Sequence, residues 1–309
     1  MMAKKVTVLM GGLSSEREVS LASGANVAEA LRQAGYDVSE LDLTRDLRPF
    51  VDALTAQKPD VVFNALHGKY GEDGCVQGIL DIMGIPYTHS GRAASALAMN
   101  KVLAKKMYRA ADLPVAAERV LTKAQILAGD VPPYPFVLKP ICDGSSVGVF
   151  IFDRDNGKKP FEGETYPYAD DEEILAEEYV AGREMTVAVM DGKALGMLEI
   201  LPAKDFYDYT AKYSNGGARH VVPSDIPAAD RDEMLRIAEE AHKALGCRGI
   251  SRSDIRYDDT GDKPRFALLE TNTQPGMTSL SLVPEIAGHA GYSYRDIVVW
   301  MVERAECGD

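Results

Sequence analysis

Residues 249–282, GISRSDIRYDDTGDKPRFALLETNTQPGMTSLSL, contain two short strand-like runs on either side of a turn rich in Asp, Gly and Pro. This pattern predicts a β-hairpin. If the turn centres near Gly261-Asp262, Asp254 lies opposite Glu270, about 5 Å away across the two strands. Asn272 then points to the same side as Glu270, because side chains alternate along an extended strand. The predicted hairpin therefore gathers two carboxylates and a carboxamide on one face.

Two carboxylates directly opposite each other repel, so this pair needs an explanation. One interpretation is a solvated acidic face with no further role. The other is a divalent metal site, because Mg²⁺ takes oxygen ligands from one or two carboxylates together with phosphate oxygens. The loop that follows, Asn272-Thr-Gln-Pro-Gly276-Met-Thr-Ser, is polar and contains a glycine. An open backbone loop beside a metal favours a reaction centre.

Length and composition limit the classes of protein to consider. The chain has 309 residues, enough for two or three domains, and its 46% hydrophobic and 26% charged residues are ordinary for a soluble globular protein. A net charge of −13 argues against broad binding to nucleic acid or to anionic membranes. The four cysteines include no CxxC pair, which indicates a reduced protein without a zinc site. No apolar run suits a signal peptide or a membrane span, so we expect a cytoplasmic protein.

The amino-terminal part of the chain alternates strand-like and helix-like runs. Apolar strands are expected at 4–10, 38–43 and 61–66, and a helix at 47–56 lies between the last two. Another helical pattern separates the first two strands and stops at Gly35. This order predicts a doubly wound parallel sheet.

Two polar loops follow strands of this sheet at their carboxyl ends, where ligands bind in such folds. Loop 11–18 contains Glu16, and loop 67–74 begins with His67. Each residue also has an ordinary explanation, because helix N-termini often carry acids and a loop histidine is often simply hydrogen-bonded. The two loops are candidates for ligand binding.

The middle of the chain combines lysines with a loop of small residues. A single amphipathic helix is expected over 95–110, and the three lysines on it, Lys101, Lys105 and Lys106, are of a kind that is mostly solvated. A strand ends at Lys139, and Asp143-Gly-Ser145-Ser146-Val-Gly148 then leads into the next strand. Backbone N–H groups of such a hairpin can close on phosphate oxygens, although the same residues also suit a plain tight turn.

The last third of the chain adds a hairpin, a long loop and a helix. Asp191-Gly192 predicts a type I′ turn, and 230–245 predicts an amphipathic helix. Residues 205–217 form a long aromatic and polar loop, which is typical of a lid. Neither a P-loop nor a dinucleotide-binding glycine pattern is present. The lysines, the small-residue hairpin, the acidic face and the lid together supply the positioning and charge neutralisation that phosphoryl transfer needs.

These motifs, taken together, resemble those of the D-alanine–D-alanine ligases of the ATP-grasp superfamily. The resemblance covers nearly the whole chain. Its motifs are, in order, Gly11-Gly12-x-Ser-x-Glu16-Arg-Glu-Val-Ser20, Leu66-His67-Gly68 with Gly71-Glu-Asp-Gly74, Lys139-Pro with Gly144-Ser-Ser-Val-Gly148, Phe206-Tyr-Asp-Tyr with Ala211-Lys-Tyr213, Arg252-x-Asp254, Glu270-x-Asn272-Thr-x-Pro-Gly276-Met-Thr-Ser279 and Ser281-Leu-Val-Pro284. Each motif alone is weakly specific, whereas all of them in this order are highly specific.

The resemblance implies a fold of mixed α/β (α+β) class, the ATP-grasp fold, in three domains. Residues 1–89 form an amino-terminal parallel α/β domain on the substrate side. Residues 90–180 form a small central domain, in which the small-residue hairpin at 143–148 is a flap over the phosphates. Residues 181–309 form a carboxy-terminal mixed-sheet domain with the metal site and the lid.

The resemblance also implies roles for individual residues. The ligands of Mg²⁺, for which Mn²⁺ could substitute, would be Asp254, Glu270 and Asn272. The ATP site would consist of Lys101, Lys139 and Lys212 at the phosphates, Ser146 in the flap, Glu177 and the backbone near Val180 at adenine, and Glu184 at the ribose. The residues that bind D-alanine would be Glu16, His67, Arg252, Gly276, Ser281 and Leu282. The catalytic set would be Glu16, Ser145, Tyr213 and Arg252, the first three as a hydrogen-bonded group.

The implied activity is the ATP-dependent ligation of two D-alanines, through an acyl phosphate, for peptidoglycan precursor synthesis. A homodimer is implied as well. Water must be excluded from an acyl phosphate, which gives the flap and lid a purpose. Relatives that make D-alanyl-D-lactate typically carry Phe at the position of Tyr213, so Tyr favours the dipeptide. Two alternatives are a different ATP-grasp carboxylate–amine ligase and a non-catalytic nucleotide-binding protein.

Several positions depart from the common pattern of the family. They are Asn100, Cys142, Asp143 and Gln274. None of them removes an implied metal or substrate ligand, so we expect altered affinity rather than lost activity.

Overall fold

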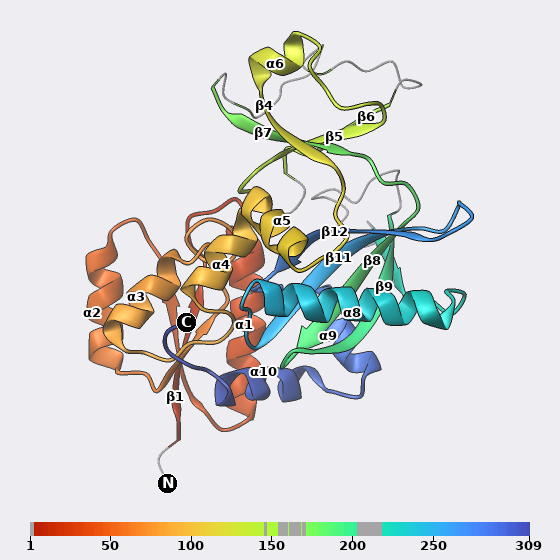
Figure 1. Ribbon diagram of the computed structural model, residues 1–309. Coiled ribbons are helices and arrows are strands. Elements are labelled where there is room, and N and C mark those ends of the chain that lie inside the picture. The colour runs from red at the N-terminus through yellow and green to blue at the C-terminus, as the bar shows by residue number, and fades with distance from the viewer. Residues whose placement is uncertain (1–2, 145–146, 154–159, 161–167, 169–170, 203–217) are drawn as a thin grey trace.

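The computed structural model describes residues 3–309 except 145–146, 154–159, 161–167, 169–170 and 203–217 (Figure 1). The strands of the described residues form three sheets, of three, four and five strands. The predicted lid loop and the small-residue pair Ser145-Ser146 lie outside the described residues. None of the helices in the described part of the chain combines the length and apolar character that a membrane span needs.

The amino-terminal sheet is parallel, with strand order β2-β1-β3. Its strands are β1 (Lys5–Met10), β2 (Asp37–Asp42) and β3 (Val61–Asn64), and its helices are α1 (Arg17–Gln33), α2 (Leu47–Gln57) and α3 (Cys75–Met83). Every residue of β3 is buried, as its continuous apolar run predicts for a parallel strand covered on both faces. The predicted parallel α/β arrangement is confirmed.

The helix predicted over 95–110 is in fact two helices, α4 (Arg92–Met99) and α5 (Lys101–Ala110). Asn100 between them has extended dihedral angles, φ −90° and ψ 101°, and its side chain accepts a hydrogen bond from the Leu103 N–H at 3.0 Å. Asn is a strong N-cap because its side chain satisfies an otherwise unpaired N–H of the first turn. The break makes Lys101 the first residue of α5.

The central sheet is antiparallel, with strand order β4-β7-β5-β6. Its elements are β4 (Glu118–Thr122), α6 (Lys123–Leu127), β5 (Phe136–Pro140), β6 (Phe150–Phe152) and β7 (Glu173–Glu178). Lys139 is near the end of β5, as predicted, and β5 and β6 flank the small-residue segment. This sheet stands at the top of the molecule in Figure 1.

The large sheet has strand order β10-β9-β8-β11-β12 and is antiparallel throughout. Its strands are β8 (Arg183–Met190), β9 (Lys193–Pro202), β10 (Ala218–Val221), β11 (Ile250–Asp258) and β12 (Arg265–Asn272). Asp191 and Gly192, which join β8 to β9, both have positive φ, 53° and 73°. Both central residues of a type I′ turn require this, so that prediction is confirmed.

Helices cover both faces of the large sheet (Figure 1). They are α8 (Ala228–Ala244) on one face, and α9 (Leu282–His289) and α10 (Tyr294–Glu303) on the other. Met185, Val187 and Val189 of β8 belong to the cluster with α8. Ala188 and Met190, which alternate with them, belong to the cluster with α9 and α10.

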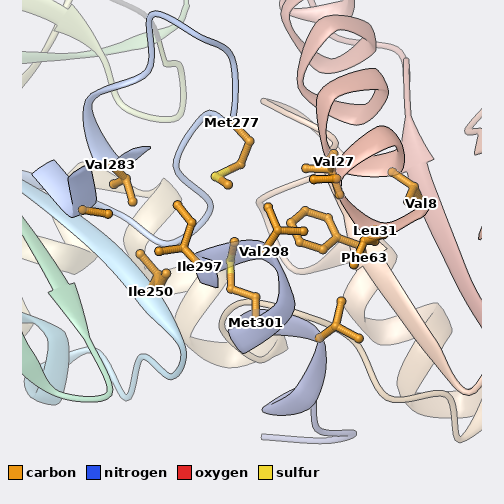
Figure 2. Close-up of a cluster of buried hydrophobic side chains, with 14 of the residues drawn as sticks. Val8, Val27, Leu31, Phe63, Ile250, Met277, Val283, Ile297, Val298 and Met301 are labelled. Atoms are coloured by element: carbon orange, nitrogen blue, oxygen red, sulfur yellow. The ribbon is translucent and has the colours of Figure 1, made fainter. Parts of the chain in front are cut away.

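One apolar cluster joins the amino-terminal sheet to the large sheet (Figure 2). It contains Val8, Val27, Leu31, Phe63, Ile250, Met277, Val283, Ile297, Val298 and Met301. Helix α10 supplies three of these side chains and lies between the two sheets. The loops of the first sheet are thereby fixed relative to the β11–β12 hairpin.

His89 is a strained and buried residue beside this junction. Its φ is +70°, an uncommon value for a residue other than glycine, and its side chain packs edge-on against Phe63 with ring centroids 5.7 Å apart. Neither ring nitrogen has a hydrogen bond of ordinary geometry within the described part of the chain. Burial, reinforced by the nearby His67, lowers the pKa of His89 to about 3.

We expect His89 to make the fold sensitive to acid. The unfolded chain binds a proton below about pH 6.5, whereas the folded imidazole stays neutral down to about pH 3. The free energy of unfolding should therefore fall by up to about 1.4 kcal/mol per pH unit below pH 6.5. In His89→Asn, which tolerates positive φ, urea unfolding at pH 7.5 and 5.5 should show a smaller loss than in the wild type. The exposed His289, changed to Asn, is the matched control, and equal losses in wild type and His89→Asn would contradict this expectation.

Candidate active site

The β11–β12 hairpin places Asp254 directly opposite Glu270, as predicted, and Arg252 opposite Asn272. The register shifts between Asp254 and Ile255, because β12 contains one extra residue, Leu269, at that point. Pairing from the turn end, where Ile255 faces Leu268, would otherwise put Leu269 opposite Asp254. A β-bulge of this kind re-aims the side chains beyond it, and here it opposes the two acids.

Two cations offset the repulsion between these acids. Arg252 donates to both oxygens of Asp254, from Nε at 3.0 Å and from Nη2 at 2.9 Å. Thr186, the partner of Asp254 on β8, donates a further hydrogen bond at 2.7 Å. Glu270 lies 3.6 Å from the Lys101 Nζ. The acids are therefore held in place by charge as well as by the strand register.

Two pockets meet at this hairpin. They have volumes of about 90 Å³ and about 350 Å³, and we call them the first and the second pocket. Both are lined by Lys101, Asp143, Gly144 and Glu270. A ligand group at this junction would touch both pockets.

The predicted site residues divide between the two pockets. Those predicted to bind D-alanine all line the first pocket: Glu16, His67, Arg252, Gly276, Ser281 and Leu282. The described members of the predicted ATP site line the second: Lys101, Lys139, Glu177, Val180 and Glu184. Of the predicted metal ligands, Asp254 lines the second pocket, Asn272 the first and Glu270 both. Ser145, Ser146, Lys212 and Tyr213 lie outside the described residues.

The first pocket is polar, and helix termini contribute to its wall. Glu16 is buried just before α1, and Leu282 is the first residue of α9. The unpaired N–H groups of a helix N-terminus favour a carboxylate.

His67 is buried with Nε2 3.3 Å from the Ser23 Oγ. Burial lowers the pKa of His67, and the charge of Glu16 opposes this shift.

Glu72 is a pocket residue to which sequence analysis assigned no role. It lines the first pocket and is half-buried. Burial raises the pKa of Glu72 to about 8, and the charge of Glu16 adds to the shift. Its place in the motif Gly71-Glu-Asp-Gly74 was the only sign in the sequence that Glu72 could belong to the site. The motif does not show the burial that shifts this pKa.

The second pocket has a buried ion network in its wall. Glu177 of β7 is 2% exposed and forms ion pairs with Lys139 of β5 and with Lys105 of α5. Lys105 is fully buried and lies 3.3 Å from Glu118 as well. The expectation that Lys105 is solvated is wrong, because α5 turns this side chain toward the central sheet, whereas Lys106 is exposed as expected.

Opposite charges decide the protonation of this network. Burial acts to raise the pKa of Glu177, but Lys139 and Lys105 outweigh it and bring this pKa below its ordinary value. Burial lowers the pKa of Lys105, and Glu177 opposes that shift. Each charge therefore depends on the others for its stability in the pocket wall.

The donors beside the junction fit Mg²⁺ in their chemistry. Asp254 and Glu270 supply carboxylate oxygens, and Asn272 supplies a carboxamide oxygen that accepts from the Gln274 N–H at 2.7 Å. Mg²⁺ binds to proteins through one or two carboxylates together with substrate phosphates. Within the described ranges, no cluster of three or more His, Cys, Asp or Glu forms a complete site. The hairpin therefore offers a partial set of ligands that phosphate oxygens can complete.

Family models cover most of the chain. The model described as D-ala D-ala ligase C-terminus matches residues 107–303, and that described as D-ala D-ala ligase N-terminus matches 5–58 and 51–90. The D-alanine–D-alanine ligase of Paramagnetospirillum magneticum is 55% identical over 308 residues, covering 99% of this chain and 100% of that protein. That of Parvibaculum lavamentivorans is also 55% identical, covering 99% and 98%.

Solved structures show the same fold. The D-alanine–D-alanine ligase of Bacillus anthracis complexed with ATP superposes with a TM-score of 0.79 at 30% identity, covering 97% of each chain. The VanG D-Ala:D-Ser ligase of Enterococcus faecalis has a TM-score of 0.76 at 28% identity, covering 97% of this chain and 99% of that one. These comparisons confirm the predicted ATP-grasp fold class.

Loss of the Lys105 charge should destabilise the protein strongly. In Lys105→Met, Glu177 and Glu118 keep their other cations but lose the ammonium buried between them. Removing one partner of a buried ion pair typically costs about 3–5 kcal/mol, which should appear as a lower urea midpoint. Lys106→Met, one residue along the same helix and exposed, should change stability by less than about 0.5 kcal/mol. Similar midpoints for the two variants would refute the network.

Proposed function

Because the chain belongs to the D-alanine–D-alanine ligase family, we propose that its two adjoining pockets bind D-alanine and ATP and that it joins two D-alanines at their junction. The observation that carries this proposal is the wall that the pockets share, with Lys101 and Glu270 in it. A phosphoryl group at that wall can pass from a nucleotide in one pocket to a carboxylate in the other. The ATP-dependent synthesis of a dipeptide for peptidoglycan precursors is the activity of this family.

Two lysines in its wall and a volume of about 350 Å³ make the second pocket a candidate for a nucleotide. Lys101 and Lys139 would neutralise phosphates, and Glu177 and Val180, which also line this pocket, would contact adenine. Glu184 at the start of β8 would contact the ribose. The Bacillus anthracis relative was solved in complex with ATP.

We place Mg²⁺ at Asp254, Glu270 and Asn272. Mg²⁺ bound there would supply positive charge that neutralises phosphate oxygens. Arg252 and Thr186 hold the Asp254 carboxylate in position through hydrogen bonds.

The first pocket would bind the two D-alanines in turn. The carboxylate of the first, near Arg252 and the Gly276 N–H, attacks the γ-phosphate, so that an acyl phosphate forms and ADP leaves. The ammonium group of this D-alanine would pair with Glu16, and His67 would line its site. The second D-alanine, with its carboxylate at Ser281 and the Leu282 N–H, would attack the acyl carbon through its amine, and the proton that this amine loses ends on the phosphate that leaves. The tetrahedral intermediate then expels phosphate and leaves the dipeptide.

Four residues outside the described part of the chain would also belong to the site. Ser145 and Tyr213 would complete a hydrogen-bonded group with Glu16, while Ser146 and Lys212 would contact phosphates. We also propose that the chain divides into domains at 1–89, 90–180 and 181–309 and that it forms a homodimer.

A different amine acceptor is the second candidate function. The VanG relative, at 28% identity, is named for D-Ala:D-Ser ligation. The same first pocket could then accept D-serine in the second position.

The direct test is an assay of ADP and phosphate release together with product mass. With ATP, Mg²⁺ and D-alanine, we expect release that depends on D-alanine and a product with the mass of D-alanyl-D-alanine. When D-serine, D-lactate or L-alanine is added as a competing acceptor, we expect less of the mixed product than of D-alanyl-D-alanine. Folded protein that releases no ADP with D-alanine would contradict the proposed function, and a dominant mixed product with D-serine would favour the second candidate.

Asp254→Asn should lose most of the activity while keeping its fold. The substitution removes the charge of one proposed metal ligand and of the partner of Arg252. Because such an ion contributes several kcal/mol to transition-state stabilisation, kcat should fall roughly 100-fold or more. Asp262→Asn, in the exposed turn of the same hairpin, is the matched control and should keep full activity. Circular dichroism checks the fold, and near-normal kcat in Asp254→Asn would remove Asp254 from the metal site.

A further inference from the structure

A short connection crosses between two sheets beside the second pocket. Residues 179–182, which we call the strap, join β7 of the central sheet to β8 of the large sheet. Three strap residues, Tyr179, Val180 and Gly182, line the second pocket, and Glu184 follows at the start of β8. The strap therefore links the proposed adenine and ribose contacts.

One guanidinium group on β11 holds the strap through hydrogen bonds. Arg256 of β11 donates from Nε to the Val180 carbonyl at 3.0 Å and from Nη2 to the Gly182 carbonyl at 2.6 Å. Its Nη1 lies 3.6 Å from the Glu184 carboxylate, and its Cζ lies 5.7 Å from the centre of the Tyr179 ring. The Arg256 side chain is only 16% exposed. A single rigid fork thus contacts both ends of the strap.

Gly182 shows independently that the strap lies against β11. Its φ is +88°, and a Cβ atom there would come within 2.3 Å of the Tyr257 carbonyl oxygen and 2.7 Å of the Asp258 Cα. These atoms belong to the backbone, which cannot move aside as a side chain can. The strap is therefore in backbone-to-backbone contact with the strand that carries Arg256.

We propose that Arg256 is a positioning residue of the nucleotide site, which fixes the strap in the conformation that ATP binds. This inference rests on the proposed function of the second pocket. The two charged hydrogen bonds set the direction of the peptide groups at 180 and 182, and hence of the backbone groups that face the pocket. A strap without them would have to be ordered when the nucleotide binds, and that ordering costs affinity.

Arg256 should affect the binding of ATP and not the binding of D-alanine or the chemical steps. Arg256 lines the second pocket but is not among the lining residues of the first pocket, where D-alanine would bind. Its loss should therefore raise the KM for ATP and leave the KM for D-alanine and kcat nearly unchanged. A general loss of stability would instead reduce the amount of active enzyme and hence the apparent kcat.

Arg256→Met, which keeps the length of the side chain but no donor, is the main variant. We expect the KM for ATP to rise roughly tenfold, since hydrogen bonds from charged groups contribute about that much or more, with kcat and the KM for D-alanine within about twofold. Calorimetric titration with ATP and Mg²⁺ in the absence of D-alanine should show the same loss in affinity. Arg119→Met is the matched control. Arg119 lies on β4, outside both pockets, and the substitution removes its bidentate pair with Asp130.

Two further variants test the strap itself. Gly182→Ala should displace the strap while leaving Arg256 present, and it should raise the KM for ATP in the same selective way. Arg256→Lys keeps the charge but has a single ammonium group for two carbonyls, so the KM for ATP should rise less than in Arg256→Met. This variant tests the inference if Arg256→Met does not fold. An unchanged KM for ATP in the folded Arg256 variants, with normal wild-type turnover, would overturn the inference. Absence of ATP-dependent ligation in the wild type would instead overturn the proposed function.

Discussion

The opposition of Asp254 and Glu270 depends on the single extra residue in β12 that shifts the hairpin register. Without this bulge, Glu270 would face Ser253, and the acids would no longer be directly opposed. The bulge also places Arg252 opposite Asn272. Since side chains two residues apart share a face, all four polar groups lie together at the junction of the two pockets. The apolar cluster around α10 then holds the amino-terminal loops, with Glu16 and His67, against the same junction.

Buried charge is the second constraint, because three acids in the walls of the pockets lie beside cations. Arg252 pairs with Asp254, Lys101 lies near Glu270, and Lys139 and Lys105 pair with Glu177. Removing ions from water costs several kcal/mol each unless partners compensate, so these pairs keep the charges in the walls of the pockets. Phosphates and a metal ion would therefore bind among groups that are already held in place.

Local patterns predicted much of this structure. Pairing about a turn near Gly261-Asp262 predicted the opposition of Asp254 and Glu270, although the exact pairing also needs the bulge in β12. Asp191-Gly192 predicted its type I′ turn, because that turn depends on neighbouring residues. Longer-range features were missed. The helix break at Asn100 competes with a good helical pattern, and the burial of Lys105 depends on the central sheet packed against α5. The contact of Arg256 with the strap joins residues 76 positions apart, which no spacing rule indicates.

The central claim is that a phosphoryl group passes from a nucleotide in the second pocket to a carboxylate in the first. The most direct measurement uses D-alanine labelled with ¹⁸O in both carboxylate oxygens, followed by mass analysis of the phosphate released during turnover. If the carboxylate attacks the γ-phosphate, one labelled oxygen stays with the phosphate when the acyl phosphate is cleaved by the amine. We therefore predict one ¹⁸O atom in each phosphate. Phosphate without label would show that its oxygen came from water, and it would contradict a reaction at the shared wall of the pockets.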